Sequence, residues 1–204
     1  MSDAAVGRLL AASLHQGIAD LLPTRLEFYE GWLHPITLRE GRIGVAPLLA
    51  VLSFLRQEGE PYRLVTARSG EYAADWTFSE LGGMERALIK GAPRAVKVRL
   101  VTRVARRLVE RTYLTTGTRS RWRRGQGRLE IRGSVFCDVR HRSTAPLCDY
   151  YVAAVRQLFT RFDLSMDVRV EECRASGSER CRLTVTEAET ADELALAGVA
   201  TTDR

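Results

Sequence analysis

The chain has 204 residues, a formal net charge of +6, and 45% hydrophobic against 27% charged residues. These values are typical of a soluble globular protein of one domain, large enough to form its core without disulfides. No stretch approaches the roughly eighteen apolar residues of a membrane span, and the start lacks the cationic region of a secretory signal. We therefore expect a cytoplasmic protein whose four cysteines are metal ligands or buried thiols.

Apolar residues at helical spacing predict that the N-terminal half is mainly helical. A first helix is expected over residues 4–22 and ends at Pro23, and a short one follows over residues 26–33. For residues 36–44 we expect an irregular connection or a short strand. Pro47 marks the first turn of a third helix, which stops at Gly59. Residues 62–78 predict a helix interrupted at Ser69-Gly70, and Gly82-Gly83 predicts a turn.

A basic amphipathic helix is predicted to begin at Pro93. Its apolar side gathers valines and leucines from Val96 to Val109, and its other side gathers arginines. Residues 94–128 hold twelve Lys or Arg and one acid, whereas the rest of the chain has more acids than bases. We expect Arg99, Arg103 and Arg106 to attract a carboxylate-bearing ligand, an acidic partner or an anionic lipid surface.

Two alternating runs, residues 118–124 and 129–140, predict a hairpin around the Gly125-Gln126-Gly127 turn. Its arginines and Trp122 are compatible with nucleic-acid or membrane binding, but also with a solvated hairpin in which Trp122 packs inward. We expect no sequence-specific nucleic-acid binding, because a basic patch alone is only an electrostatic footprint. In the second run Cys137 shares a face with Leu129 and Ile131, so it is expected to point into the core.

The stretch from Cys148 to Val185 predicts a helix followed by a second hairpin. Cys148 stands at the helix start, and the two alternating runs cover residues 166–173 and 180–186 around a loop containing Gly177. The order strand, strand, helix, strand, strand predicts an α+β fold, an antiparallel four-stranded sheet with helices packed on one face. Cys173 and Cys181 are then neighbours across the hairpin.

The spacing C-x24-C-x7-C, ending in EECRASGSERC, resembles the C-terminal part of the 4-vinyl reductase domain family. This family occurs in bacteriochlorophyll-biosynthesis proteins and in sensory regions of aromatic-responsive transcription activators. Subunits of the transport-particle (TRAPP) complex share its fold, which belongs to the nitric-oxide-signalling ligand-binding group. The likeness is clearest over residues 128–186. It implies a domain over residues 36–187, with a helical segment at 1–35 before it and a flexible tail at 188–204.

The resemblance also implies that Cys148, Cys173 and Cys181 bind structural zinc. The family's acidic ligand lies three residues before the second cysteine, where this chain has Val170, with Glu171 and Glu172 closer in. A β-bulge at Glu171-Glu172 would turn Cys173 toward the core, where Cys137 also points. The fourth ligand is therefore Cys137, Glu171 or Glu172, and a site with four protein ligands is structural.

For function, the resemblance implies a non-catalytic domain that holds a hydrophobic, aromatic or porphyrin-like molecule between helices and sheet, as a carrier, chaperone or sensor. Tyr72, Trp76 and Trp122 are the aromatic candidates for that cavity. One alternative is a part in tetrapyrrole 4-vinyl reduction, although no flavin, nicotinamide or phosphate-binding motif is visible. Another is a structural assembly subunit of the transport-particle type. A homo-oligomer or a partner protein is expected in each case.

Overall fold

The computed structural model describes residues 5–33, 43–113, 116–123, 125–139 and 142–188. Within them the helices are α1 (Arg8–Leu21), α2 (Leu26–Leu33), α4 (Val45–Gln57), α5 (Glu60–Glu80), α6 (Gly83–Gly91), α7 (Arg94–Thr112) and α8 (Asp149–Arg161). The strands are β1 (Ala5–Val6), β2 (Ile43–Gly44), β3 (Gly117–Arg123), β4 (Gln126–Arg132), β5 (Met166–Glu172) and β6 (Cys181–Glu187). Short 3-10 turns are η1 (Pro23–Arg25), η2 (Val135–Cys137) and η3 (Arg174–Ser176).

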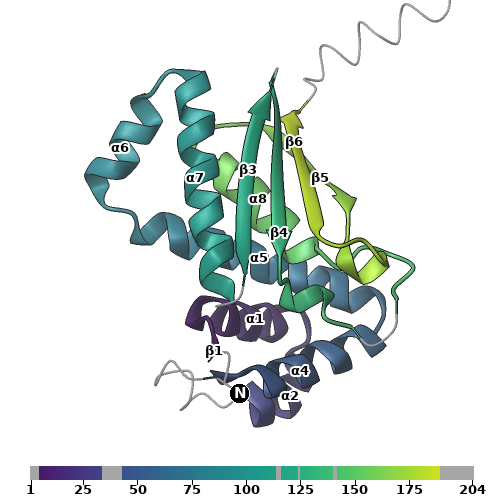
Figure 1. The fold of residues 1–204 in the computed structure, drawn as a ribbon. Helices are drawn as coiled ribbons and strands as arrows, with labels where there is room; N and C mark the ends of the chain where they lie inside the picture. Colours follow the sequence, from purple (N-terminus) through teal and green to yellow (C-terminus); the bar gives the residue numbers. More distant parts are fainter. Residues whose placement is uncertain (1–4, 34–42, 114–115, 124, 140–141, 189–204) are drawn as a thin grey trace, which may run out of the picture.

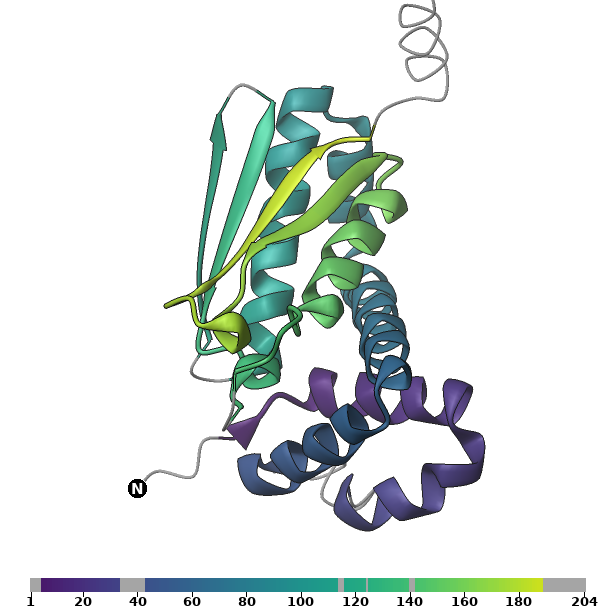
Figure 2. The same ribbon diagram turned by 90° about the vertical axis from the view of Figure 1, so that its right-hand side faces the viewer.

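The predicted α+β architecture is confirmed. The main sheet has the order β3-β4-β6-β5 with every neighbouring pair antiparallel, and helices α7 and α8 pack against one face of it (Figures 1 and 2). Helices α1, α2 and α4 lie beyond one end of the sheet and are joined to it by α5 (Figure 2). The other large face of the sheet carries no described helix.

Alternation along the strands explains why the sheet is covered on one side only. In β4 the side chains of Leu129 and Ile131 are buried, whereas Arg128 and Arg132 are exposed. In β3 exposed arginines alternate with half-buried residues that face the helices. Because successive side chains of a strand point to opposite faces, this pattern permits one dry face and one charged face.

Helix α5 is the longest helix of the described chain, and it runs without a break through Ser69-Gly70, so the predicted interruption is wrong. Gly70 is instead a packing residue, because a Cβ there would lie 2.2 Å from the carbonyl oxygen of Tyr150 in α8. Only glycine lets the two helices approach so closely, and the small residues around it in the sequence reflect this contact.

Three further local expectations differ from the structure. The predicted turn at Gly82-Gly83 instead leads into the helix α6, which the sequence analysis missed. The strand predicted over residues 129–140 ends at Arg132, where Gly133 with φ 70° turns the chain into η2. The first helix begins at Arg8, after the short strand β1.

The bulge predicted near the end of β5 is confirmed. Val170 pairs with Leu183 and Glu172 pairs with Arg182, so Glu171 is the extra residue between them. The bulge changes the alternation, and Cys173, which follows it, is 2% exposed.

Two sequence-based expectations concern regions that are mostly not described. The boundary at residue 35 falls within residues 34–42, and the predicted tail lies outside the described residues except for Ala188. Among the described helices, none combines the length and apolar character needed to cross a membrane.

Candidate metal centre and ligand cavity

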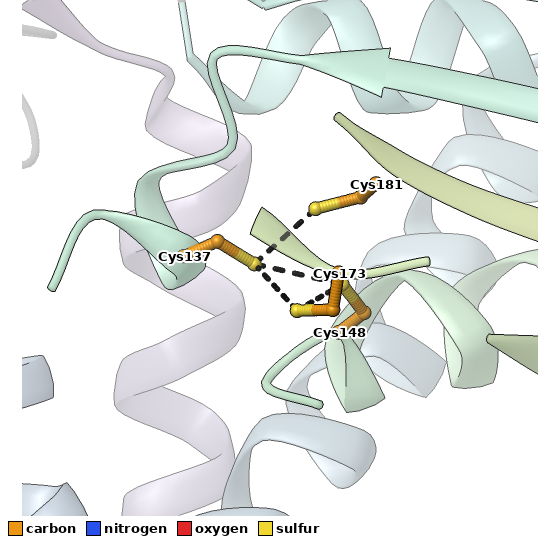
Figure 3. Close-up of side chains that lie close together, drawn as sticks. All are labelled: Cys137, Cys148, Cys173 and Cys181. Atoms are coloured by element: carbon orange, nitrogen blue, oxygen red, sulfur yellow. Dashed lines mark hydrogen bonds between the residues drawn. The ribbon is translucent and has the colours of Figure 1, made fainter. Parts of the chain in front are cut away.

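Four segments bring the four cysteines to one point. Cys137 ends η2, Cys148 is the residue before α8, Cys173 follows β5, and Cys181 begins β6. Their side chains point toward one another (Figure 3). The predicted convergence of the three thiols Cys148, Cys173 and Cys181 is thus observed, and Cys137 joins them.

The separations between sulfurs match those of a four-coordinate metal site. Cys137 Sγ lies 3.5 Å from the sulfurs of Cys148 and Cys173 and 3.4 Å from that of Cys181, and Cys148 and Cys173 are 3.6 Å apart. All four sulfurs lie within 4.8 Å of one another. A tetrahedron of thiolates with metal–sulfur bonds of about 2.3 Å has sulfur–sulfur edges of about 3.8 Å. The donor set therefore fits a zinc ion.

The environment of the cluster stabilises negative charge on sulfur. All four cysteines are buried. The backbone N–H of Leu147 donates to Cys173 Sγ, and that of Arg174 donates to Cys181 Sγ, both at 3.5 Å. Hydrogen bonds from Cys137, Cys148 and Cys181 lower the pKa of Cys173, whereas the same crowding of thiols raises the pKa of Cys148. The pKa of Cys137 is lowered as well, chiefly by its hydrogen bond with Cys148, so the cluster favours negative charge on Cys137 and Cys173.

The two glutamates that were alternatives for the fourth ligand lie elsewhere. Glu172 Oε1 is 2.6 Å from Arg182 Nη1, and Glu171 Oε2 is 3.9 Å from both Arg128 and Arg182. Both carboxylates pair with arginines of the charged sheet face. Among the three candidates, only Cys137 belongs to the described group of potential ligands.

A cavity of about 1150 Å³ opens beside the cysteine cluster. Its walls come from α2, α4, the start of α5 and the segment between η2 and α8. Apolar side chains, including Trp32, Leu49 and Phe54, form one part of the wall. Leu147 separates the cavity from the cluster, since it lines the cavity and also donates its N–H to Cys173.

The part of the cavity nearest the cysteines is polar. Tyr62 is 2% exposed, and its hydroxyl has no hydrogen-bond partner among the described residues. Burial raises the pKa of Tyr62 far above its ordinary value, so the hydroxyl remains protonated. Arg56 and Arg63 also line this part; Arg56 donates to the carbonyl of Phe136, and Arg63 lies 3.5 Å from Asp149. The wall therefore offers a buried hydroxyl and two guanidinium groups.

The prediction of a cavity between helices and sheet is wrong for the described residues. That interface holds a void of only about 10 Å³, around Trp122 and Phe159, and a space of this size holds at most one water molecule. Trp122 packs inward as expected and donates to Thr102 Oγ1. The rings of Tyr72 and Trp76 on α5 lie 5.8 Å apart with a tilt of 33°, and neither residue lines the large cavity. None of the three aromatic candidates lines that cavity.

The basic side of α7 is only partly available for an anionic surface. Arg99 and Arg103 are exposed, as predicted. Arg106 instead lies 3.4 Å from Glu110 and donates to Thr118. Val96, predicted to face the core, is 46% exposed.

No known family profile and no curated protein matches the sequence. Solved structures do share the fold. The phenol-responsive sensory domain of the transcription activator PoxR with phenol is 15% identical, with a TM-score of 0.54 over 78% of this chain and 82% of that one. An H-NOX protein from S. oneidensis in the Fe(II)NO ligation state is 10% identical, with a TM-score of 0.52 over 90% of this chain and 99% of that one. The unliganded Fe(II) H-NOX protein from K. algicida is 11% identical, with a TM-score of 0.53 over 91% and 98%.

The chain therefore has the fold of these sensory domains. This agrees with the expectation, from the C-terminal cysteine pattern, of a fold found in aromatic-responsive activators and in nitric-oxide-signalling proteins. The cavity residues Trp32, Phe54 and Tyr62 were missed by the sequence analysis. They lie on three helices at ordinary core spacing, and nothing in the sequence distinguishes a residue beside a cavity from one in a filled core.

Proposed function

We propose that this chain is a non-catalytic ligand-binding domain that works as a sensor or carrier for a small aromatic molecule. The ligand occupies the cavity beside the cysteine cluster. The observation that carries the proposal is the wall of this cavity, in which apolar side chains stand beside Arg56, Arg63 and Tyr62, and the Tyr62 hydroxyl is buried without a partner among the described residues. A buried hydroxyl without a hydrogen bond costs free energy, and a ligand with a polar group would recover it.

The chemistry of the wall indicates the ligand class. Trp32, Leu49 and Phe54 suit an apolar or aromatic body, while Tyr62, Arg56 and Arg63 suit a hydroxyl or carboxylate at one end. A phenol or an aromatic acid has both features. The likeness of fold to a phenol-responsive sensory domain supports this choice. A larger, porphyrin-like ligand is compatible with a volume of about 1150 Å³.

We further propose that the domain is 4-vinyl-reductase-like, spans residues 36–187, and holds one structural zinc ion through Cys137, Cys148, Cys173 and Cys181. The metal would join η2, the start of α8 and the β5–β6 hairpin. With all four positions taken by protein thiolates, no position remains for substrate, so the role is structural. Zinc would also fix Leu147, which separates the cluster from the cavity.

Calorimetric titration with phenol, benzoate and a porphyrin tests the ligand proposal. Tyr62→Phe should weaken binding of the preferred compound by about 3- to 10-fold, because one hydrogen bond is lost. Tyr72→Phe is the matched control, since its hydroxyl contacts Asp20 outside the cavity and its removal should leave affinity unchanged. Absence of binding by all three compounds, or equal loss in both variants, would reject the proposal.

Elemental analysis of protein purified without chelator tests the metal proposal. About one zinc per chain is expected. Less than about half an equivalent after such handling would remove the metal proposal. The same preparation, examined by native mass spectrometry, gives the oligomeric state and any co-purifying ligand.

A further inference from the structure

The charged face of the main sheet is ordered into rows by the strand register. Each row runs across the four strands β3, β4, β6 and β5, at right angles to them (Figure 1). One row contains Arg119, Glu130, Arg182 and Glu172, and the next contains Arg121, Arg128, Thr184 and Arg169. The two rows differ sharply in how their charges are compensated.

The first row is neutral and internally paired. Arg182 lies 2.6 Å from Glu172 and 3.7 Å from Glu130, and Arg180 adds a further ion pair to Glu130 at 3.0 Å. Arg180 and Arg182 are held close to the sheet, with 30% and 22% of their side chains exposed. This row is a stabilising charge ladder of alternating sign.

The second row holds three arginines and no acid. Arg121 stands directly opposite Arg128, an arrangement of like charges that destabilises a sheet unless something else compensates it. Its arginines extend into solvent, with Arg128 at 53% and Arg169 at 83% side-chain exposure. Carboxylates from neighbouring positions pair with two of these arginines: Glu171 is 3.9 Å from Arg128, and Asp167 is shared by Arg156 and Arg169. Among the described residues, Arg121 is the one arginine of the row without an ion pair.

Thr184 lies at the centre of this row, between Arg128 and Arg169. It is 8% exposed, and its hydroxyl has no hydrogen-bond partner among the described groups. Above the row the surface is hollowed: Arg121, Arg123, Gln126 and Arg128 line a depression of about 590 Å³. A second hollow, which shares Arg121 and Arg128, continues it toward Arg180.

We propose that this face binds the phosphate backbone of double-helical nucleic acid without reading its sequence. Guanidinium groups match phosphate in geometry, and exposed arginines that bind a polyanion release its counterions, which lowers the free energy of the complex. The row is about 14 Å long, from strand spacings of about 4.8 Å, which is close to the major-groove width of about 12 Å. Its ends can therefore reach phosphates on the two strands. This proposal does not depend on the ligand cavity.

The composition of this face argues against single-stranded nucleic acid and lipid bilayers as partners. Among the described residues of the four strands, the face carries no aromatic side chain, since Trp122 points to the helices. Base stacking, on which single-strand binders rely, is therefore missing. The face also lacks the apolar side chains that insert into a lipid bilayer.

The test measures binding of a labelled 20-base-pair duplex by fluorescence anisotropy at a series of salt concentrations. The wild-type affinity should fall steeply with salt. The triple variant Arg121→Ala, Arg128→Ala and Arg169→Ala should lower the slope of log K against log salt by about 3, about 1 for each phosphate contact. The triple lysine variant at these positions should keep most of the slope, because it keeps the charge.

The matched control removes the same charge from α7, through Arg94→Ala, Arg99→Ala and Arg103→Ala, and should keep the slope. Absence of duplex binding at 50 mM salt, or equal slope loss in both alanine variants, would overturn the proposal. Vesicles containing phosphatidylserine serve as a second probe, and retention on vesicles without duplex binding would also overturn it. Circular dichroism of each variant confirms that folding is kept.

Discussion

The two sides of Leu147 differ in how their polar groups are satisfied. On one side, four thiols lie within 4.8 Å of one another and two of them accept backbone N–H donors, a closed arrangement that a single cation would complete. On the other side, Tyr62 lines an open cavity, and its hydroxyl is buried without a hydrogen-bond partner among the described residues. We therefore expect the closed side, the cysteine cluster, to contribute mainly to stability and the open side, the cavity, to contribute to binding.

The largest effect should come from the closed side. Cys173→Ser should abolish zinc binding and lower the free energy of unfolding by more than about 4 kcal/mol, with a fall in Tm of about 8–16 °C. The reason is that the four cysteines lie on separate segments, which a bound metal would join only in the folded state. Differential scanning calorimetry with zinc analysis measures both quantities. Wild-type protein treated with chelator is the control and should behave like the variant; a variant with unchanged Tm would contradict the metal assignment.

The next largest effect is expected at the α5–α8 contact. Gly70→Ala would place a Cβ 2.2 Å from the Tyr150 carbonyl oxygen, and we expect it to destabilise the fold by about 3 kcal/mol. Gly31→Ala is the matched control within α2, where a Cβ meets nothing within 4 Å. It should be neutral or stabilise by up to about 1 kcal/mol. Urea unfolding of the two variants separates packing from helix propensity, and similar midpoints would reject the close contact.

A smaller, pH-dependent effect is expected from an ion pair between the same helices. Burial acts to raise the pKa of Asp75, but hydrogen bonds from Arg161 and Gln157 outweigh it and hold that pKa below 3.8. A carboxyl group whose pKa is lowered by folding stabilises the fold at pH values above its ordinary pKa. This stabilisation is lost as the pH falls through the pKa of the folded state. Asp75→Asn should therefore cost about 1 kcal/mol at pH 7, since the pair is partly exposed.

The pH series decides whether this loss is electrostatic. The stability difference between wild type and Asp75→Asn should shrink as pH falls from 5 to below 3.8. Asp163→Asn, at an exposed ion pair with Lys90, is the control and should change stability little. A difference that stays constant with pH would mean that Asp75 acts through packing.

The smallest effect is expected at the open side. In the absence of ligand, Tyr62→Phe should change the free energy of unfolding by less than about 0.5 kcal/mol, because the hydroxyl has no bond to lose. Tyr150→Phe should cost about 1 kcal/mol, since Tyr150 is equally buried but bonds to Ser13 at 3.2 Å. Thermal unfolding of both variants measures the contrast. Equal losses would show that Tyr62 is satisfied within the protein.

The sequence by itself determined the succession of strands and helix in the C-terminal half, the basic helix and the bulge. Alternating and helical patterns are local, so β3, β4, β5, β6, α7 and α8 follow from residues close in the chain. The bulge at Glu171 could be predicted because only one extra residue reconciles the strand alternation with an inward Cys173. The resemblance of the C-terminal cysteines also led to three of the four thiols that the structure brings together.

Tertiary structure alone decided the rest. Gly70 looks like a helix break in sequence, yet it is a contact with α8, more than seventy residues away. The cavity lies between α2, α4 and the segment before α8, which are far apart in the sequence. Its position depends on how these elements pack, so no local sequence pattern predicts it. The arginine row likewise depends on the register of four strands, which sets Arg121 opposite Arg128 and aligns Arg169 with them across Thr184. Long-range packing and register, rather than local propensity, decide where function can lie.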